Sequence, residues 1–192
     1  GNGIEFANLV ALNLKIKIQV FKNFGTAMIK NKGFQIEFVG ARKESYSESS
    51  RNPEIKKGTL YDDLSRRDFT INALAIKLNG KEKGELIDNH NGLNDLNNNI
   101  LKTPKDPIKT FHDDPLRMLR AIRFSTQLNF EIDKNDFECI KNESERINII
   151  SMERINDELN KILISTKPSI GLNLLDKAGL LKKLIPERYS LH

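Results

Sequence analysis

The chain has 192 residues, 38% of them hydrophobic and 30% charged, which is enough for one or two domains with a real core. Its 31 Lys and Arg against 26 Asp and Glu leave a net charge of +5, which favours an anionic partner without identifying one. The single cysteine excludes an intramolecular disulfide and a thiolate metal cluster, and no apolar run reaches the roughly 20 residues of a membrane helix, so we expect a cytoplasmic protein without a membrane segment.

The first third of the chain mixes helical and strand patterns. Residues 4–14 place apolar side chains at helical spacing and predict a helix. Residues 15–20 and 34–38 alternate polar and apolar side chains, and 26–29 add a short apolar run, so we expect strands with one apolar and one polar face. Glu37 falls on the polar face of its strand, where a site could be built.

Residues 43–62 have a different composition, rich in Ser, charged residues and turn formers. This composition predicts a long mobile loop, and such loops inside compact domains are usually functional or disordered. Three basic residues of the loop, Arg51, Lys56 and Lys57, could attract an RNA backbone.

From about residue 105 the patterns are helical. The sequence predicts one helix that begins at Asp113-Asp114-Pro115 and ends near 128, one over 151–163, and one that begins at Pro168 and is closed by Gly179. We therefore expect an α/β head of about 100 residues joined to a helical second half.

Several familiar catalytic patterns are absent from the sequence. It contains no GxxxxGK[ST], no GxGxxG after a strand and no GxSxG. The histidines at 90, 112 and 192 lack the spacing of metal ligands. A zinc site or a Ser-His hydrolase is therefore not expected.

Arg117, Arg120 and Arg123 step by three along a predicted helix, and Asp114 precedes the first of them by three. This spacing also fits an amphipathic helix with a solvated basic face. Hydrogen-bond chemistry adds a second interpretation, because a carboxylate only accepts and a guanidinium only donates. Side by side, the two groups match adenine or cytosine, whose edges carry an amino donor beside a ring-nitrogen acceptor. Guanine and uracil show the reverse pattern and would leave unpaired polar groups, at about 1–3 kcal/mol each.

The segment Arg66-Arg67-Asp68 offers a second constellation. Two adjacent arginines suit triphosphate oxygens, and the carboxylate of Asp68 could accept from sugar hydroxyls. Asn72 lies on the same side as Asp68 if the segment is helical. An equally open interpretation is that Asp68 only caps a helix.

Glu37 could serve as a metal ligand only if partner carboxylates lie on neighbouring strands.

Four segments in order carry a resemblance to a known family: RRDFTINALA (66–75), DNHNGLNDL (88–96), DDPLRMLRAIRF (113–124) and SMERINDELNKIL (151–163). They resemble motifs of the class II tRNA nucleotidyltransferases and bacterial poly(A) polymerases, the CCA-adding enzyme family. In that family the third motif is an amino-acid template for the incoming base, and the fourth supports the template helix. The resemblance implies an α+β fold, with a partial nucleotidyltransferase head over 1–104 and an all-helical neck over 105–192 that recognises the base and binds RNA.

The resemblance also implies roles for individual residues. Asp114 and Arg117 would read the Watson–Crick edge of ATP or CTP, which agrees with the donor and acceptor argument. The remaining nucleotide contacts would come from Arg67 on the triphosphate, Asp68 on the ribose with Asn72 beside it, and Arg120 and Arg123 on the nucleotide or its phosphates.

The sequence also departs from the family. Asp113 stands where the family usually has Glu, a shorter arm of the same charge. Glu37 would be an auxiliary catalytic carboxylate near the family's pair of Mg²⁺ ions. The family's Gly-Gly-x-x-Arg-Asp turn and Asp-x-Asp metal-binding strand are absent from these 192 residues, so we expect little or no transferase activity from this chain alone.

The implied function is template-independent RNA nucleotidyl transfer, in which CMP and AMP from CTP and ATP are added to tRNA 3′ ends. The motifs leave open CCA, CC-only, A-only and poly(A) addition. A non-catalytic nucleotide- or RNA-binding module of the same architecture is an alternative. A DNA-binding protein that uses 113–128 as a recognition helix would explain the basic charge but not RRDFTINA.

Overall fold

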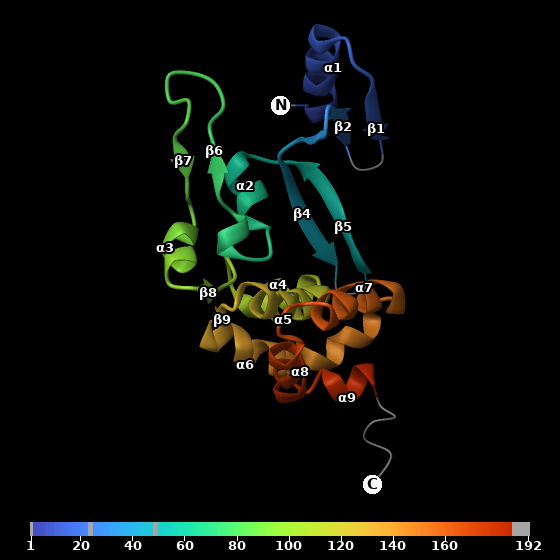
Figure 1. Ribbon diagram of the computed structural model, residues 1–192, viewed down its shortest axis with the longest axis vertical. Helices are drawn as coiled ribbons and strands as arrows, with labels where there is room; N and C mark the ends of the chain where they lie inside the picture. Colours follow the sequence, from blue (N-terminus) through green and yellow to red (C-terminus); the bar gives the residue numbers. More distant parts are fainter. Residues whose placement is uncertain (1, 23–24, 48–49, 186–192) are drawn as a thin grey trace. The chain divides into compact units, whose positions relative to one another are not determined.

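The computed structural model describes residues 2–22, 25–47 and 50–185, without the side chains of 44–47 and 50–55 (Figure 1). Both helices and strands occur, which confirms the predicted α+β class. By its internal contacts the chain divides into two compact units: Gly1–Ser45 with Pro53–Asp63, and Tyr46–Asn52 with Leu64–His192. The boundary between head and neck that we expect near residue 104 does not coincide with this division, and it stays a prediction.

The first unit contains one helix on a three-stranded antiparallel sheet. The elements are α1 (Gly3–Leu14), β1 (Ile18–Phe21), β2 (Thr26–Asn31) and β3 (Phe34–Val39), with the strands in the order β1-β2-β3. The side chain of Asn2 accepts from the backbone at the start of α1, and Ala7 and Ala11 are buried. The predicted helix and strands are confirmed, except that β1 begins three residues late because Lys15 adopts a left-handed conformation, φ 54°, that ends α1.

The apolar face expected on β3 is not buried. Phe34 is 75% exposed and Ile36 is 48% exposed, while Phe38 meets Phe6 of α1 edge to face at 5.6 Å between ring centroids. The buried positions of α1 are small residues, so the helix offers little cover for the apolar side chains of β3. Glu37 is exposed and lies opposite Met28 of β2.

The prediction of a long mobile loop over 43–62 is wrong. The backbone forms β4 (Arg42–Ser47) and β5 (Ser50–Lys57), which pair as a two-stranded sheet, followed by α2 (Leu60–Ser65). At the start of α2 the Thr59 hydroxyl donates to Asp62 at 2.7 Å and accepts from the Asp62 backbone N–H at 3.1 Å. Backbone hydrogen bonds hold a two-stranded ribbon without the alternation of apolar residues from which strands are predicted.

The second unit is mostly helical and packs around α5 (Leu116–Leu128), against which α7 (Met152–Leu163) and α8 (Pro168–Lys177) lie. These three helices confirm the sequence prediction. The other elements are η2 (Thr70–Asn72), β6 (Ala75–Ile76), β7 (Leu86–Ile87), α3 (Gly92–Asn97), β8 (Ile100–Leu101), α4 (Pro107–Asp113), β9 (Glu131–Ile132), α6 (Lys134–Glu143), η3 (Ser144–Ile149) and α9 (Leu181–Leu184).

The core of this unit is formed by fully buried apolar side chains of α5 and its neighbours, among them Phe69, Leu101, Phe111, Met118, Leu119, Ile122, Ile140, Ile162 and Leu175. Gly171 of α8 fits closely here, because a Cβ at this position would lie 2.4 Å from the Ile162 side chain. Across the described ranges, no helix is both long enough and apolar enough to cross a membrane.

The junction between α4 and α5 fixes the start of the central helix. α4 ends at Asp113, and Asp114 has an extended backbone, φ −139° and ψ 94°, before Pro115 and the first turn of α5. One carboxylate oxygen of Asp114 accepts from the backbone N–H of Leu116 at 3.3 Å, as a cap does. The predicted helix start is therefore displaced by one residue, with Pro115 at the cap position.

Candidate functional site

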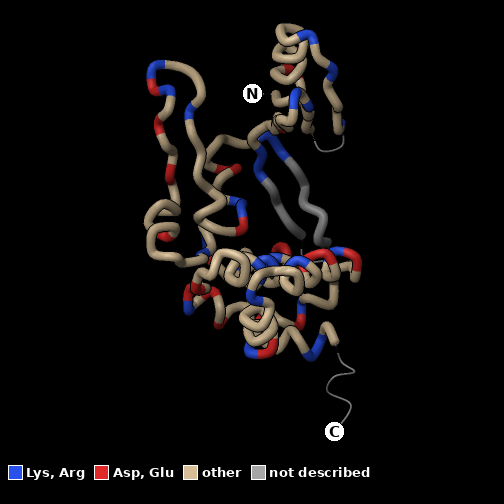
Figure 2. Tube along the Cα trace, in the orientation of Figure 1, with Lys and Arg blue, Asp and Glu red and all other residues tan. Residues whose placement is uncertain are grey.

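A basic cavity of about 540 Å³ lies in the second unit, between the segment 66–72 and the first turns of α5 and α7. Five arginines and two aspartates line it, so its net charge suits an anionic ligand. Lys and Arg positions follow α5 beside acidic positions of α7 (Figure 2). The lining consists of Arg66, Arg67, Asp68, Asn72, Asp114, Leu116, Arg117, Arg120, Phe124 and Arg154.

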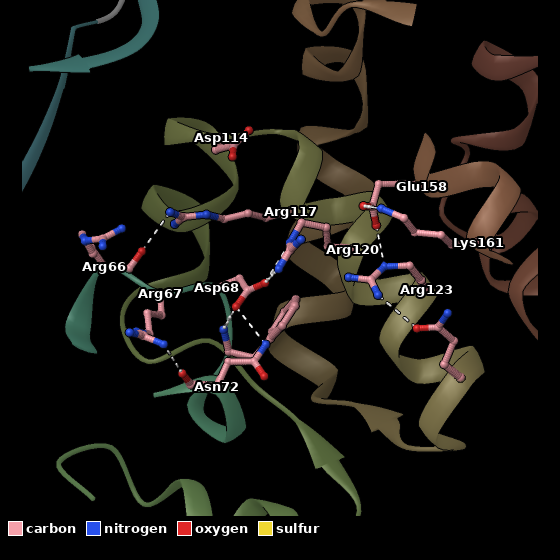
Figure 3. Close-up of polar contacts among 12 residues, drawn as sticks. Arg66, Arg67, Asp68, Asn72, Asp114, Arg117, Arg120, Arg123, Glu158 and Lys161 are labelled. Carbon is pink, nitrogen blue, oxygen red and sulfur yellow. Dashed lines mark hydrogen bonds and ion pairs between the residues drawn. The ribbon is translucent and has the colours of Figure 1, made fainter. Parts of the chain in front are cut away.

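Asp114 and Arg117, the predicted base readers, both line this cavity. The Nη2 atom of Arg117 donates to the backbone carbonyl of Arg66 at 2.8 Å (Figure 3). The Oδ2 atom of Asp114 lies 3.6 Å from Nη2 of Arg154, while its other oxygen caps α5. An acceptor and a donor thus line the same cavity, and each is held by a different partner.

Arg154 was not predicted as a site residue. It lies in the first turn of α7, within the segment that resembles the family's fourth motif, and its side chain reaches the same cavity. The motif was the available signal, but sequence spacing does not show which of its side chains approaches Asp114, forty residues earlier in the chain.

Asp68 is buried, and its carboxylate accepts four hydrogen bonds (Figure 3). Oδ1 accepts from the backbone N–H of Phe69 at 3.0 Å and from Nδ2 of Asn72 at 3.0 Å. Oδ2 accepts from Nε and Nη2 of Arg120 at 2.8 and 2.5 Å. The expected closeness of Asp68 and Asn72 is confirmed, although a short 3₁₀ turn, η2, brings them together instead of an α-helix.

The two adjacent arginines also line the cavity. Arg67 is exposed, and its Nη1 atom donates to the backbone carbonyl of Asn72 at 3.1 Å. Arg66 contributes its own carbonyl as the acceptor for Arg117. The segment therefore supplies both guanidinium groups and a backbone acceptor to the same cavity.

Arg123, predicted to hold the nucleotide, does not line the cavity. Its Nε donates to Glu158 at 2.5 Å, and its guanidinium lies 3.8 Å from the ring centroid of Phe124. Burial acts to raise the pKa of Glu158, but the hydrogen bonds from Lys161 and Arg123 outweigh it and lower that pKa. Arg123 thus joins α5 to α7 as a buried ion pair.

Asp113 also stands outside the cavity lining. It is the last residue of α4, and burial raises the pKa of its carboxyl although the positive charges of Lys109 and Arg117 oppose the shift. The structure therefore separates the two adjacent aspartates, because only Asp114 turns into the cavity.

The remaining predicted residues belong to the first unit or lie outside the described part. Glu37, Lys56 and Lys57 are exposed, and the side chain of Arg51 lies outside the described residues. Within the described ranges, no group of three or more His, Cys, Asp or Glu could hold a metal ion. The carboxylate partners that would make Glu37 a metal ligand are therefore not among these residues.

A second cavity, of about 650 Å³, opens near the end of α5 and is lined largely by apolar side chains of β9, α6 and α8. None of the predicted site residues lines it. The basic cavity is thus the one that gathers six of the residues singled out from the sequence: Arg67, Asp68, Asn72, Asp114, Arg117 and Arg120.

Residues 1–102 match the family model described as the poly A polymerase head domain. The chain belongs to the poly(A) polymerase family of nucleotidyltransferases. The resemblance stated from the four motifs is thereby confirmed. A second model, described as a probable RNA and SrmB-binding site of polymerase A, matches residues 129–191.

Curated members of this family are similar over most of the chain. It is 40% identical over 150 residues to the CCA-adding enzyme of Ligilactobacillus salivarius, which covers 77% of this chain and 36% of the relative. It is 39% identical over 141 residues to the A-adding tRNA nucleotidyltransferase of Aquifex aeolicus, covering 73% of this chain and 17% of the relative. The chain thus spans well under two thirds of the length of these family members.

Solved structures of the family share the fold. The apo form II of a CCA-adding enzyme has a TM-score of 0.88 at 35% identity, covering 97% of this chain and 44% of that one. A tRNA nucleotidyltransferase complexed with a primer tRNA and an incoming ATP analog has a TM-score of 0.83 at 32% identity, covering 96% and 52%.

Proposed function

We propose that the complete protein adds CMP and AMP from CTP and ATP to the 3′ ends of tRNA without a nucleic-acid template. The observation that carries this proposal is the common basic cavity, which both Asp114 and Arg117 line. The relatives named CCA-adding enzyme, and the related structure with a primer tRNA and an ATP analog, support it.

Base selection would follow from hydrogen-bond chemistry. Asp114 accepts from the exocyclic amino group of adenine or cytosine, and Arg117 donates to the neighbouring ring nitrogen. Guanine and uracil place a carbonyl against the carboxylate, so that a buried acceptor stays unpaired. Both protein groups are held in the free chain, because a carboxylate oxygen of Asp114 accepts from the Leu116 backbone N–H and Arg117 is bonded to the Arg66 carbonyl. Little ordering would therefore be needed when the base binds.

The phosphates would bind at the basic side of the cavity, where Arg66, Arg67 and Arg120 lie. In the reaction the 3′ oxygen of the RNA attacks the α-phosphorus, the bond to the bridging oxygen breaks, and pyrophosphate leaves with that electron pair. The contribution of these residues is to bind and orient the nucleotide.

Mg²⁺ is our proposed cofactor for the complete enzyme, where it would stabilise charge on the phosphates. The described residues do not fit such a site, since they contain no group of three ligating side chains. No step is assigned to the metal in this chain, and Glu37 stays a candidate auxiliary carboxylate.

We further propose that Arg51, Lys56 and Lys57 attract the RNA backbone. We also propose that the enzyme acts in the cytoplasm.

Incubating the full-length protein with tRNA transcripts that end before CCA, with each nucleotide separately, tests the proposal. CTP should be incorporated first, ATP only after two cytidines, and GTP and UTP not at all. Long adenosine tails on unrelated RNA would instead indicate poly(A) polymerase activity, which the name of the head-domain model favours as the second candidate. Nucleotide binding without incorporation would indicate a non-catalytic module.

A further inference from the structure

We propose that Asp136 of α6 is a positioning residue for the basic cavity, and that it acts by holding the segment 99–103, to which the turn at 70–72 is hydrogen-bonded. The proposal rests on the nucleotide-binding function proposed for this cavity. Asp136 does not line the cavity, and it lies outside the four segments that resemble family motifs. Its effect on the cavity therefore has to pass through other residues.

The first step is the contact between the Asp136 carboxylate and Thr103. Oδ2 of Asp136 accepts from the Thr103 backbone N–H at 2.6 Å, and Oδ1 lies 3.3 Å from the Thr103 hydroxyl oxygen. Both residues are buried, since Asp136 is 2% and Thr103 is 4% exposed. A buried backbone N–H that lacks an acceptor is costly, so the carboxylate helps to determine where residue 103 lies.

The second step is the attachment of the same segment to β9, which directly precedes α6. β8 and β9 pair in parallel (Figure 1), and the backbone N–H of Asp133 donates to the Leu101 carbonyl at 2.9 Å. The strand pairing ends at residue 101, and Asp136 extends the attachment to residue 103. Residue 102 is thus held between two neighbours that are each bonded to the same part of the chain.

The third step leads from residue 102 to the turn that supplies part of the cavity lining. The carbonyl of Lys102 accepts from the backbone N–H of Thr70 at 2.8 Å. Thr70 is the first residue of η2 and is 2% exposed, and Asp68 and Asn72 on either side of it line the cavity. A displacement of residue 102 would therefore shift these side chains relative to the lining residues of α5.

A second attachment limits the size of the expected effect. The Thr70 hydroxyl donates to Oδ2 of Asp95 at 2.7 Å, so the turn keeps one buried contact when its bond to residue 102 lengthens. Loss of the Asp136 carboxylate should therefore misplace the turn without releasing it. We expect weaker nucleotide binding and not its complete loss.

ATP binding and backbone amide exchange of the full-length protein test this series of contacts. In Asp136→Ala the Thr103 N–H loses its acceptor, so amides in peptides that span 66–72 and 99–105 should exchange about tenfold faster than in the wild type. The dissociation constant of ATP should rise about three- to tenfold. Should Asp136→Ala not fold, Asp136→Ser gives the same comparison, because its hydroxyl is one bond shorter than the carboxylate oxygens.

Asp136→Asn is the conservative variant and should restore binding. The Thr103 hydroxyl donates to the Lys105 carbonyl at 2.8 Å, so its oxygen can accept from an amide at 136 while the amide oxygen accepts from the Thr103 N–H. Burial raises the pKa of the Asp136 carboxyl to about 6, against the hydrogen bond from the Thr103 N–H, so a neutral group meets no added cost of burial there. ATP should bind within about twofold of the wild type.

Ile140 provides the control for a loss of stability alone. It is fully buried in the core on the same helix, one turn beyond Asp136. Of Ile140→Val and Ile140→Ala, the variant whose melting temperature is closer to that of Asp136→Ala is compared. It should bind ATP within about twofold of the wild type and exchange more slowly over 66–72 than Asp136→Ala does.

ATP binding by Asp136→Ala that equals the wild type would overturn the inference, and so would an equal loss of binding in the Ile140 variant. Faster exchange over 99–105 without a change over 66–72 would overturn it too, because the step through Lys102 would then be missing. A wild-type protein that binds no ATP would overturn the proposed function together with the inference, whereas the other outcomes remove the inference alone.

Discussion

The three arginines that follow one side of α5, Arg117, Arg120 and Arg123, differ in what they contact. Arg117 and Arg120 line the basic cavity, and both donate hydrogen bonds to the segment 66–68. Arg123, one step further, is only 11% exposed and pairs with Glu158, which is 5% exposed. The same residue type at the same spacing therefore lines the basic cavity at one end and joins two helices at the other, and the partner of each arginine decides which.

The largest expected effect is at the packing end. Arg123→Ala leaves Glu158 buried with Lys161 as its remaining described cation, so the free energy of unfolding should fall by about 3 kcal/mol, as urea denaturation measures it. The paired substitution Arg123→Met with Glu158→Leu should recover most of the loss, since no charge is left unpaired. A change below about 1 kcal/mol in Arg123→Ala would contradict a structural role.

At the cavity end, Arg117→Ala should reduce the preference for ATP and CTP over GTP and UTP by about tenfold, because the ring-nitrogen donor is lost. Titration of the four nucleotides against the chain measures this preference. Unfolding in urea should change by less than about 1 kcal/mol, in contrast to Arg123→Ala. An equal loss for all four nucleotides would show that Arg117 binds phosphate instead of the base.

A smaller effect is expected at Arg154, whose contact with Asp114 is 3.6 Å long and partly exposed. Arg154→Ala should lower the same nucleotide preference about two- to threefold, in keeping with the 0.2–1 kcal/mol of an exposed ion pair. Lys161→Ala removes a cation from the same helix outside the cavity and is the matched control. If both variants lower the preference equally, Arg154 has no particular relation to the base reader.

The smallest expected effect is the pH dependence of the stability that the ion pair between Arg123 and Glu158 contributes. The pKa of Glu158 is lowered in the folded chain, so its ion pair stabilises the fold above about pH 4.5, the ordinary value of a Glu, and this contribution is lost as the pH falls through the folded pKa. The difference in unfolding free energy between the wild-type chain and Glu158→Gln should therefore shrink below pH 4.5. A difference that stays constant down to pH 3 would show that the charge of Glu158 does not matter.

Local signals in the sequence were enough for the helices of the second unit. Periodic apolar residues and the predicted start and stop signals at Asp113-Asp114-Pro115, Ser151 and Gly179 locate α5, α7 and α8 within about a residue. The β4–β5 ribbon was missed because its strands pair through backbone atoms, and no alternation of apolar residues marks it.

The candidate site was only partly predictable for a different reason. The spacing of Asp114 and Arg117 is local, and both line the cavity as expected. The bond between Asp68 and Arg120 joins residues 52 positions apart, and the stripe of arginines gives no sign that Arg123 points to α7 instead. Pairings over such distances depend on packing of the core, which periodicity does not encode.

The hydrogen bond between Arg117 and the main-chain oxygen of residue 66 affects which substitutions that position tolerates. Every amino acid carries that oxygen, so position 66 can vary in its side chain without releasing the guanidinium that rests on it. The bond between Asp68 and Arg120 lacks this tolerance, because both partners are side chains. As far as these two contacts are concerned, a change of side chain is tolerated at 66 more readily than at 68 or 120.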